Sequence, residues 1–370
     1  MVEPQQVNLL SNQLLETKSR PFSIPVRTTF VLPKMIRSGG PRVTVELANS
    51  LISRGYNIRL AAGKVSLSIR TLFQAMYCHL TGKAYCHWGK YYNGKIQYYR
   101  QLEDLGFLKG EIVISVGTRA IERLKKLDAE IKKVRYCHGF DTSDFELTRK
   151  VWSGTMATIS VSNTLVPKLQ EYSGEEVMAV IPNGVRKEQY FIEERNRDGI
   201  GMVYEEHPNK SPEDAKKLYF IIRERWPDLP VYVFSTSFRP SCISPSSYWY
   251  YPSIQKAREL YNRAKIWLSP SRMEGFGLPL LEAMACGAAC ISTDNPGGRE
   301  LIQHGINGYL VPTGQPEAFI PSIELLLNNE NLRKKIVIEG LKTVDRFSWS
   351  NATDKMEDFL HKLYLNFQST

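Results

Sequence analysis

Short apolar runs alternate with helix-like segments in both halves of the chain, and this alternation restricts the fold more than any other feature. Strands linked through helices run parallel, because each connection crosses back over the sheet. The sequence therefore predicts an α/β protein with two doubly wound, Rossmann-like lobes in series. The predicted strands are 28–32, 58–61, 112–116, 133–137 and 157–161 in the first half, and 199–203, 230–235, 264–268 and 288–293 in the second. The predicted helices include 43–54, 212–225 and 254–263.

The size of the chain agrees with two lobes. It has 370 residues, of which 42% are hydrophobic, so it is too long for one compact core and apolar enough for two ordinary domains. Turn residues cluster at 181–185, and a charged run without clear periodicity follows at 186–198. We therefore expect an N-terminal lobe at 1–185, a linker at 186–198 and a C-terminal lobe at 199–344.

The hydropathy pattern gives no sign of a membrane span. The longest apolar stretch, Pro279 to Ile291, is interrupted by Glu282 and Gly287, whereas a span needs about 18 apolar residues. Residues 1–20 are polar and lack the apolar run of a secretory signal. We expect a cytoplasmic protein.

The cysteines are scattered and suggest reduced thiols. There are six of them in a chain without an export signal, so a disulfide framework is not expected. The triplet Tyr-Cys-His occurs at 77–79, 85–87 and 136–138, but the spacing matches no common zinc site. We expect no metal site.

Positive charge is concentrated in the first half. Residues 1–183 hold 25 Lys and Arg against 15 Asp and Glu, whereas residues 184–370 hold 23 of each kind. This asymmetry suggests an anionic partner, such as nucleic acid, acidic lipid headgroups or a phosphorylated acceptor, although a basic surface can also serve only solubility. The stretch 64–100 holds six basic residues, eight aromatic residues and no acidic one. It suits a membrane, glycan or base-stacking interface, or an insertion whose aromatic side chains pack onto the first lobe.

A glycine pair precedes the first predicted helix. Gly39 and Gly40 lie in the loop 33–41, between the first strand and that helix. Free backbone N–H groups and the helix dipole favour an anion at such a position, although a plain tight turn would have the same sequence.

The segment 270–287 carries the most specific pattern in the chain. Pro279 suits the first turn of a helix and Gly287 the position just past its end. Glu274 would then lie on the loop and Glu282 inside the helix, so one ligand could span both carboxylates. The backbones of Gly275 and Gly277 could present N–H groups to a diphosphate.

This segment resembles the Glu-x7-Glu signature of glycosyltransferase family 4, whose members have the GT-B fold of two Rossmann-like lobes facing each other across a cleft. The resemblance rests on Glu274, Glu282, the Gly-Phe-Gly between them and the Glu-Ala-Met-Ala-x-Gly that ends at Gly287. It implies that Glu274 bonds hydroxyls of the donor sugar and that Glu282 bonds the ribose hydroxyls. The amides of Phe276 to Leu278 would contact the sugar and the phosphates.

Further segments resemble the same family and extend the resemblance over most of the chain. Gly39 and Gly40 match the glycine loop that approaches the donor diphosphate, and His138 matches a histidine near the donor sugar. The other matching segments are 181–185, 295–300, 304–312 and 347–349. The resemblance also implies that a final helix, within 345–370, crosses back onto the first lobe.

The chain departs from the family pattern at one position. The family usually has an Arg shortly after the first strand of the second lobe and a Lys several residues later, which together neutralise the diphosphate. Here Gly201 is followed by Met202. Lys210 is the candidate for the lysine, and Arg239 is a candidate replacement cation. Losing the Arg would remove a charge-assisted bond to the leaving group.

The resemblance implies a retaining hexosyl- or deoxyhexosyltransferase. It would move a sugar from a nucleotide-diphosphate sugar to a glycan or lipid-linked acceptor, in cell-surface polysaccharide or glycoconjugate synthesis. The chain contains no Asp-x-Asp, so we expect neither a metal nor another cofactor. The basic N-terminal lobe could hold the enzyme at the inner face of an anionic membrane, and no nucleic-acid partner is expected. The alternatives are a non-catalytic nucleotide-sugar-binding protein of the same fold and a sugar-nucleotide epimerase or phosphorylase.

Overall fold

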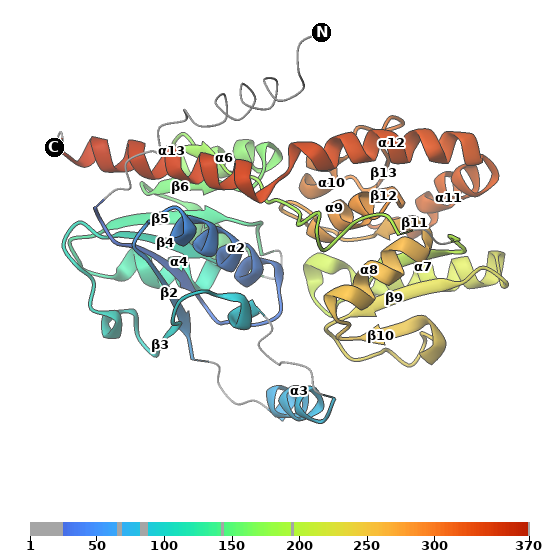
Figure 1. Cartoon of the computed structure of the whole chain (residues 1–370), viewed down its shortest axis with the longest axis horizontal. Coiled ribbons are helices and arrows are strands. Elements are labelled where there is room, and N and C mark those ends of the chain that lie inside the picture. The colour runs from blue at the N-terminus through green and yellow to red at the C-terminus, as the bar shows by residue number, and fades with distance from the viewer. Residues whose placement is uncertain (1–24, 65–68, 82–87, 142–143, 194–195, 369–370) are drawn as a thin grey trace, which may run out of the picture.

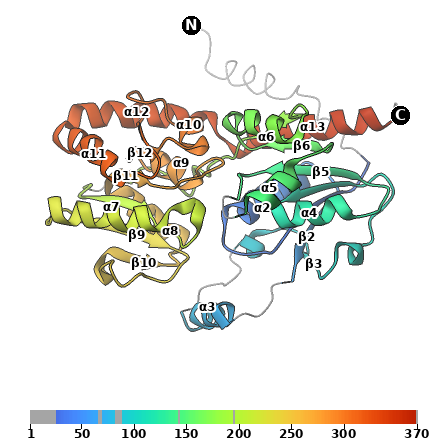
Figure 2. The same ribbon diagram turned by 180° about the vertical axis from the view of Figure 1, so that it is seen from behind.

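The computed structural model describes residues 25–64, 69–81, 88–141, 144–193 and 196–368. Within these ranges, two parallel β-sheets lie side by side, and helices cover both faces of each sheet (Figure 1, Figure 2). The predicted α/β class with two doubly wound lobes is confirmed.

The N-terminal lobe is built on a seven-stranded sheet of order β3-β2-β1-β4-β5-β6-β7. Its strands are β1 (Thr28–Leu32), β2 (Ile58–Gly63), β3 (Gln97–Tyr99), β4 (Ile112–Val116), β5 (Lys132–Cys137), β6 (Ala157–Ser160) and β7 (Ala179–Val180). Its helices are α2 (Gly39–Ser53), α3 (Ile69–Leu80), α4 (Thr118–Lys126), α5 (Phe145–Trp152) and α6 (Val166–Ser173). Every residue of the central strands β1 and β4 is buried, as expected where helices cover both faces of a parallel sheet.

The C-terminal lobe has a six-stranded sheet of order β10-β9-β8-β11-β12-β13. Its strands are β8 (Gly199–Val203), β9 (Val231–Ser235), β10 (Tyr248–Tyr250), β11 (Ala264–Ser269), β12 (Ala289–Thr293) and β13 (Tyr309–Val311). The helices of this half are α7 (Pro212–Arg225), α8 (Ile254–Arg263), α9 (Leu278–Ala285), α10 (Pro296–Leu301), α11 (Phe319–Asn328), α12 (Glu330–Arg346) and α13 (Trp349–Gln368). In each sheet the chain adds strands first on one side of the lobe's first strand (β1 or β8) and then on the other. Doubly wound folds form their ligand crevice at this switch point.

Two helix starts determine where the backbone N–H groups lie. Helix α2 begins at Gly39, four residues before the predicted start, so the glycine pair forms its first turn. Helix α9 begins at Leu278, directly after Gly277, whose φ of 89° is in the left-handed region. Gly287 ends that helix with a φ of 77°. Glycine adopts such angles without the steric cost of a Cβ atom.

The chain crosses between the lobes a second time near its C-terminal end. Helix α12 runs over the C-terminal lobe, and α13 continues over the N-terminal lobe beside α2 (Figure 1). Asp354 on α13 pairs with Arg54 at 2.6 Å, and Thr353 donates a hydrogen bond to Ser50 on α2. None of the described helices combines the length and the hydropathy that a membrane span requires.

Candidate active site

A cavity of about 660 Å³ separates the lobes at the carboxyl ends of their strands. Its walls come from segments that follow β1, β5, β8, β9 and β11, the edge at which α/β sheets bind ligands. Most of the predicted site residues line this cavity: Gly39, Gly40, His138, Lys210, Glu274, Gly275, Phe276, Gly277, Leu278 and Glu282. The fold therefore brings together residues that lie up to 243 positions apart.

The loop after β11 is held firmly and positions Glu274. The backbone N–H of Gly297 donates to the carbonyl oxygen of Glu274 at 2.8 Å, and Met273 donates to the carbonyl of Asn209 at 2.9 Å. Lys210 donates to the Glu274 carboxylate, with 2.5 Å between Nζ and Oε1. Lys210 thus balances the charge of Glu274 on the cavity wall. Its ammonium group also borders the space in which a phosphate could bind.

Glu282 is held by partners from both lobes. Its side chain is almost fully buried, and one carboxylate oxygen accepts a hydrogen bond from Arg42 on α2. The other oxygen accepts a hydrogen bond from the Tyr261 hydroxyl at 2.9 Å. Burial, and then the Glu282 charge, raise the pKa of Tyr261 well above its ordinary value, so this hydroxyl remains a donor. Neither Arg42 nor Tyr261 was predicted from the sequence, since neither belongs to a recognisable motif.

The lobes touch where His138 meets the loop of Glu274. A Cβ atom on Gly275 would overlap the carbonyl group of His138, so only glycine permits this approach of the two backbones. The His138 ring lies edge-on to Tyr136, with 4.2 Å between ring centroids. Its Nε2 atom is buried and has no hydrogen-bond partner among the described residues.

Burial lowers the pKa of His138 to about 3 from an ordinary value of 6.5. The imidazole therefore stays neutral at the pH at which the protein would work. A neutral imidazole can donate or accept one hydrogen bond through each ring nitrogen, according to its tautomer. It cannot act as the cationic acid of a proton transfer.

This low pKa predicts how stability depends on pH. Between pH 6.5 and 3 the unfolded chain binds a proton at His138 and the folded protein does not, so acid favours unfolding. We expect the melting temperature of the His138→Gln variant to fall less between pH 7 and pH 4.5 than that of the wild type. Thermal unfolding at several pH values would measure both slopes. Equal slopes would mean that His138 is accessible to protons in the folded protein.

The cavity is lined neither by Met202 nor by Arg239, the candidate replacement cation. Met202 is fully buried in the core of the C-terminal lobe, on strand β8. The Arg239 guanidinium donates to carbonyl oxygens of its own loop, at Pro240 and Ile243, and Arg239 is not among the residues that line the cavity. Of the candidate lysine Lys210 and the candidate replacement cation Arg239, Lys210 is therefore the one that borders the cavity.

A carboxylate that sequence reasoning missed also borders the cavity. Glu205, just after β8, accepts hydrogen bonds from the backbone and the hydroxyl of Thr236 at 2.6 and 2.9 Å, and from the hydroxyl of Ser237 at 2.9 Å. This network ties the end of β8 to the end of β9. A single glutamate after a strand gives no signal that would have marked it in the sequence.

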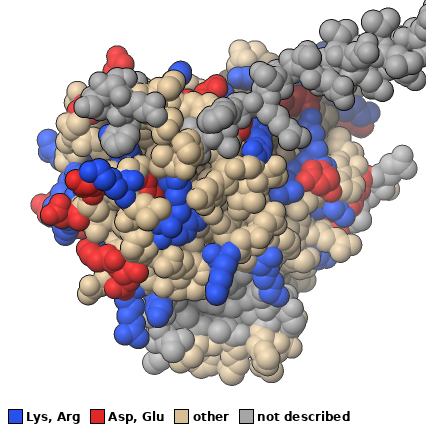
Figure 3. Space-filling view, turned by 60° about the vertical axis from the view of Figure 1, so that its left-hand side comes forward, with Lys and Arg blue, Asp and Glu red and all other residues tan. Residues whose placement is uncertain are grey.

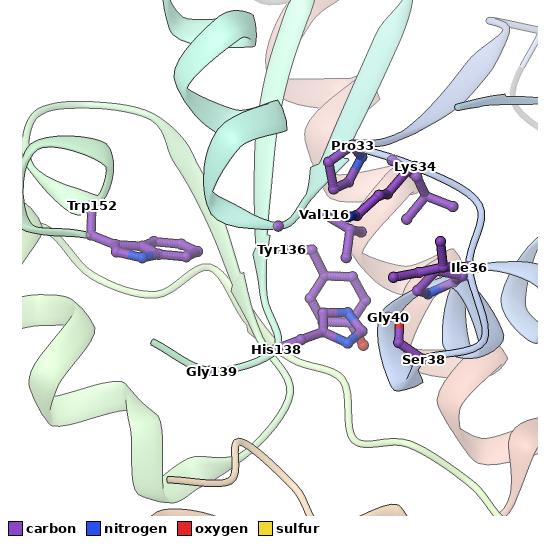
Figure 4. Close-up of a pocket in the computed structure, with 13 residues that line it drawn as sticks. Pro33, Lys34, Ile36, Ser38, Gly40, Val116, Tyr136, His138, Gly139 and Trp152 are labelled. Atoms are coloured by element: carbon purple, nitrogen blue, oxygen red, sulfur yellow. The ribbon is translucent and has the colours of Figure 1, made fainter. Parts of the chain in front are cut away.

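A smaller cavity of about 190 Å³ adjoins the large one on the side of the N-terminal lobe (Figure 4). The two cavities share Lys34, Ile36, Ser38, Gly40 and His138. In Figure 4 the His138 ring lies close to Tyr136 and near Ser38 and Gly40. A second molecule bound in this cavity would therefore lie next to one bound in the large cavity.

In the basic and aromatic stretch 64–100, some apolar side chains are buried and others are exposed to solvent. Its residues 65–68 and 82–87 lie outside the described residues. Trp88, Tyr92 and Tyr99 are buried, as the packing interpretation predicts. On α3, by contrast, Leu72, Phe73, Met76 and Leu80 are at least half exposed.

Helix α3 lies away from both sheets, below the gap between the lobes in Figure 1. Its Tyr77 ring contacts Tyr250 of the C-terminal lobe, with 4.7 Å between centroids. On the face of the molecule shown in Figure 3, Lys and Arg side chains are scattered rather than gathered into one patch.

The described residues contain no group of three or more His, Cys, Asp or Glu side chains arranged to hold a metal ion. Cys137, Cys242, Cys286 and Cys290 are free thiols. Burial raises the pKa of Cys290, and it also raises the pKa of Cys137 to about 12, so both stay protonated. Cys86 and His87, which belong to the second Tyr-Cys-His triplet, lie outside the described residues.

Comparisons with known proteins give a partial sequence match. Residues 249–343 match the family described as Glycosyl transferases group 1. A D-inositol 3-phosphate glycosyltransferase of Corynebacterium urealyticum is 26% identical over 181 residues, which cover 44% of this chain and 43% of that protein. The capsular polysaccharide biosynthesis glycosyltransferase CapM of Staphylococcus aureus is 33% identical over 98 residues, 26% of each chain. The chain thus spans less than half the length of these relatives.

Solved structures match over nearly the whole chain at low sequence identity. Sucrose-phosphate synthase from Thermosynechococcus elongatus aligns with a TM-score of 0.69 and 13% identity, covering 92% of this chain and 100% of that one. Anabaena HepE, in complex with UDP-glucose, aligns with a TM-score of 0.69 and 14% identity over 90% and 99% of the two chains. The protein therefore has the GT-B fold of these glycosyltransferases, and its segment 249–343 is similar to glycosyl transferases of group 1.

Proposed function

We propose that this protein is a glycosyltransferase that moves a hexosyl or deoxyhexosyl group from a nucleotide-diphosphate sugar to a glycan or lipid-linked acceptor, with retention at the anomeric carbon. The observation that carries the proposal is the single cavity lined by Glu274, Lys210, Glu282 and the starts of helices α2 and α9. CapM, whose name assigns it to capsular polysaccharide biosynthesis, supports a role in the synthesis of cell-surface polysaccharide or glycoconjugate.

The proposed donor lies along the start of α9. Helix N-termini favour phosphates because their first N–H groups are unpaired and the helix dipole is positive there. The diphosphate would meet the starts of α2 and α9 and the ammonium group of Lys210. Glu274 would accept hydrogen bonds from sugar hydroxyls, and Glu282 from the ribose hydroxyls.

In the proposed reaction, the acceptor hydroxyl attacks the anomeric carbon from the face that the diphosphate leaves. The new bond joins the acceptor oxygen to that carbon, the bond between the carbon and the phosphate oxygen breaks, and the hydroxyl proton passes to the leaving phosphate. Lys210 and the helix N-termini stabilise the charge that develops on the diphosphate. We propose that this arrangement makes a divalent ion unnecessary. His138 would donate or accept one hydrogen bond beside the sugar.

Retention can be tested without knowing the natural acceptor. The protein would be incubated with an α-linked nucleotide sugar and a pool of candidate glycans and lipid acceptors, in the presence of EDTA. Proton NMR of the first product would show an α-anomeric coupling if the configuration is retained. A β-linked product would overturn retention, and transfer only after adding Mg²⁺ or Mn²⁺ would overturn metal independence.

The glycines at the start of α2 provide a test that separates binding from folding. A Cβ atom on Gly39 would meet no atom closer than 4.0 Å, so packing does not require glycine there. We expect Gly39→Ala to keep or raise the melting temperature, since Ala favours helix, and to weaken nucleoside-diphosphate binding about tenfold by keeping phosphate away from the backbone. Calorimetric titration checks this expectation, and unchanged affinity would contradict it.

We further propose that the acceptor is presented to the N-terminal lobe near α3, at an anionic membrane surface. The exposed apolar residues Leu72, Phe73 and Met76 on α3 and the net positive charge of residues 1–183 support this placement. Vesicles with acidic phospholipid should retain the protein at low salt and release it at high salt. Failure to bind such vesicles at low salt would remove the membrane from the proposal.

A non-catalytic nucleotide-sugar-binding protein is the second candidate, and Met202 favours it. The side chain at this position is apolar and buried, so it contributes no charge to the cavity. Such a protein would bind the donor and release no nucleoside diphosphate with any acceptor.

A further inference from the structure

Arg42 is the most buried Lys or Arg side chain among the residues that line the large cavity. It lies in the first turn of α2, two residues after Gly40, and only 6% of it is exposed. Its Nη1 atom donates to Glu282 in the opposite lobe. The rings of Trp88 and Tyr190 lie around the guanidinium, with ring centroids 4.9 and 5.5 Å from Cζ. These contacts fix the plane of the guanidinium group.

The remaining donors of Arg42 are unused. Its Nε and Nη2 atoms are buried and have no hydrogen-bond partner among the described residues. In a guanidinium group, the N–H of Nε and one N–H of Nη2 point the same way and form a fork that matches two oxygens of a phosphate or carboxylate. Buried donors without an acceptor are costly, and each one in a native protein calls for an explanation.

The ion pair with Glu282 keeps this fork charged. Burial alone would lower the pKa of Arg42, but Glu282 and then Tyr190 raise it above its ordinary value. The neighbouring start of α2 adds the positive end of a helix dipole. The side chain of the N-cap residue Ser38 makes no capping hydrogen bond to this turn. Arg42 therefore stays charged beside the carboxylates of Glu282 and Glu46, and the start of α2 adds positive potential next to it.

The C-terminal lobe contributes little positive charge to the cavity wall apart from Lys210. Lys210 is already paired with Glu274, Met202 lies in the core, and Arg239 bonds the carbonyls of its own loop. In the N-terminal lobe, Lys34 and Arg37 also line the cavity, and Arg37 donates to the carbonyl of Pro252 in the opposite lobe. A donor diphosphate carries more negative charge than Lys210 alone would neutralise, and Arg42 is the most buried of these cations.

We propose that Arg42 binds the diphosphate of the nucleotide donor through Nε and Nη2, and so replaces, from the N-terminal lobe, the cation that the C-terminal lobe lacks at Met202. This inference rests on the proposed function, since it requires a nucleotide-diphosphate ligand in the cavity. The diphosphate would then contact Arg42 in one lobe and Lys210 in the other, and donor binding would hold the lobes together.

A purely structural role for Arg42 makes a different prediction. If Arg42 served only to hold Glu282, its loss would weaken ribose binding, and a nucleoside and its diphosphate would lose affinity equally. If Arg42 binds phosphate, only the diphosphate loses affinity.

The test is calorimetric titration of UDP, GDP, ADP and dTDP, and of the nucleoside of whichever binds best, into the wild type and Arg42→Lys. Lysine keeps the charge beside Glu282 and removes the fork. We expect the affinity for the diphosphate to fall about 10- to 100-fold, the usual range for hydrogen bonds to a charged group, and the affinity for the nucleoside to stay unchanged. Arg225→Lys is the matched control, because Arg225 is half exposed on α7 and also pairs with a glutamate, Glu324. It should bind both ligands as the wild type does.

The outcomes separate the two proposals. Unchanged diphosphate affinity in Arg42→Lys, or an equal loss for diphosphate and nucleoside, would overturn the role of Arg42 while leaving the proposed function intact. If no nucleotide bound the wild type, the proposed function would fail, and the role of Arg42 with it. Arg42→Gln is a second variant, to be used if Arg42→Lys unfolds. The glutamine amide can still donate to Glu282 but carries no charge. This variant should show the same selective loss of affinity for the diphosphate.

Discussion

Replacing Glu274 with glutamine is expected to lower kcat/KM for sugar transfer by about two to three orders of magnitude, which is the usual cost of removing a charged group that acts on the transition state. The substitution keeps the size of the side chain and the backbone bonds of its loop to Gly297 and Asn209. It removes the negative charge beside Lys210. It also weakens the proposed acceptor of hydrogen bonds from the donor sugar. A carboxylate in this place would also favour the positive charge that develops on the sugar during transfer.

Release of nucleoside diphosphate from the donor, in the presence of a competent acceptor, measures this effect. Binding of the free nucleoside diphosphate should not weaken, because the proposed contacts of Glu274 are with the sugar and the substitution frees Lys210 from its ion pair. Glu324→Gln is the control, since Glu324 is a surface carboxylate that also pairs with a cation, Arg225. Full activity in Glu274→Gln would remove Glu274 from the proposed reaction.

Replacing Gly275 with alanine is expected to lower the rate of transfer at least 100-fold by changing how the lobes meet. The new Cβ atom would overlap the carbonyl group of His138 and lie 2.9 Å from the amide nitrogen of Gly139. These are backbone atoms that cannot rotate away, so the lobes must separate or the loop of Glu274 must shift. A displacement of about 1 Å in a catalytic group can cost 100-fold in rate, so we expect at least that loss.

Kinetics and small-angle X-ray scattering together test this prediction, with an increase in the radius of gyration expected if the lobes separate. Gly340→Ala in α12 is the control, because a Cβ atom there would meet no atom closer than 3.7 Å. A Gly275→Ala variant with wild-type rate and scattering would show that the active protein does not bring His138 and Gly275 this close.

The sequence predicted the central strands because they are short runs of mostly apolar and β-branched residues, interrupted only by small polar residues such as Ser115. Strands β1, β4 and β12 are buried throughout. The observed bounds of β1 and β4 equal the predicted ones, and β12 lies inside the predicted strand 288–293. The edge strands β3, β7 and β10 have only two or three residues each and were not predicted. Strands this short carry no pattern of hydropathy that distinguishes them from loops.

Helix boundaries were predictable where glycine or proline marks them. Pro279 and Gly287 placed α9 to within about one residue. At α2 the glycines misled the prediction. Because glycine disfavours helix, the predicted start fell after Gly39 and Gly40, whereas the helix begins at Gly39. In the structure both glycines nevertheless lie in the first turn of α2.

The candidate site was predictable where a motif marks it and not where the fold alone assembles it. Glu274, Glu282 and the glycines belong to local patterns. The contact between Arg42 and Glu282 joins residues 240 positions apart, and the Tyr261 hydroxyl reaches the same carboxylate from a neighbouring helix. Such pairs follow from the packing of the lobes, which one sequence does not reveal.

The most direct test of the central claim, that the cavity between the lobes binds a nucleotide-diphosphate sugar, is a thermal-shift screen in EDTA. UDP, GDP, ADP, dTDP and their common sugar conjugates would each be added to the purified protein. A ligand that binds only the folded state raises its melting temperature, and we expect one base to give a rise of about 3 °C or more at saturating concentration. If none of these nucleotides stabilised the protein at millimolar concentration, the cavity would not be a nucleotide-sugar site and the proposed function would be wrong.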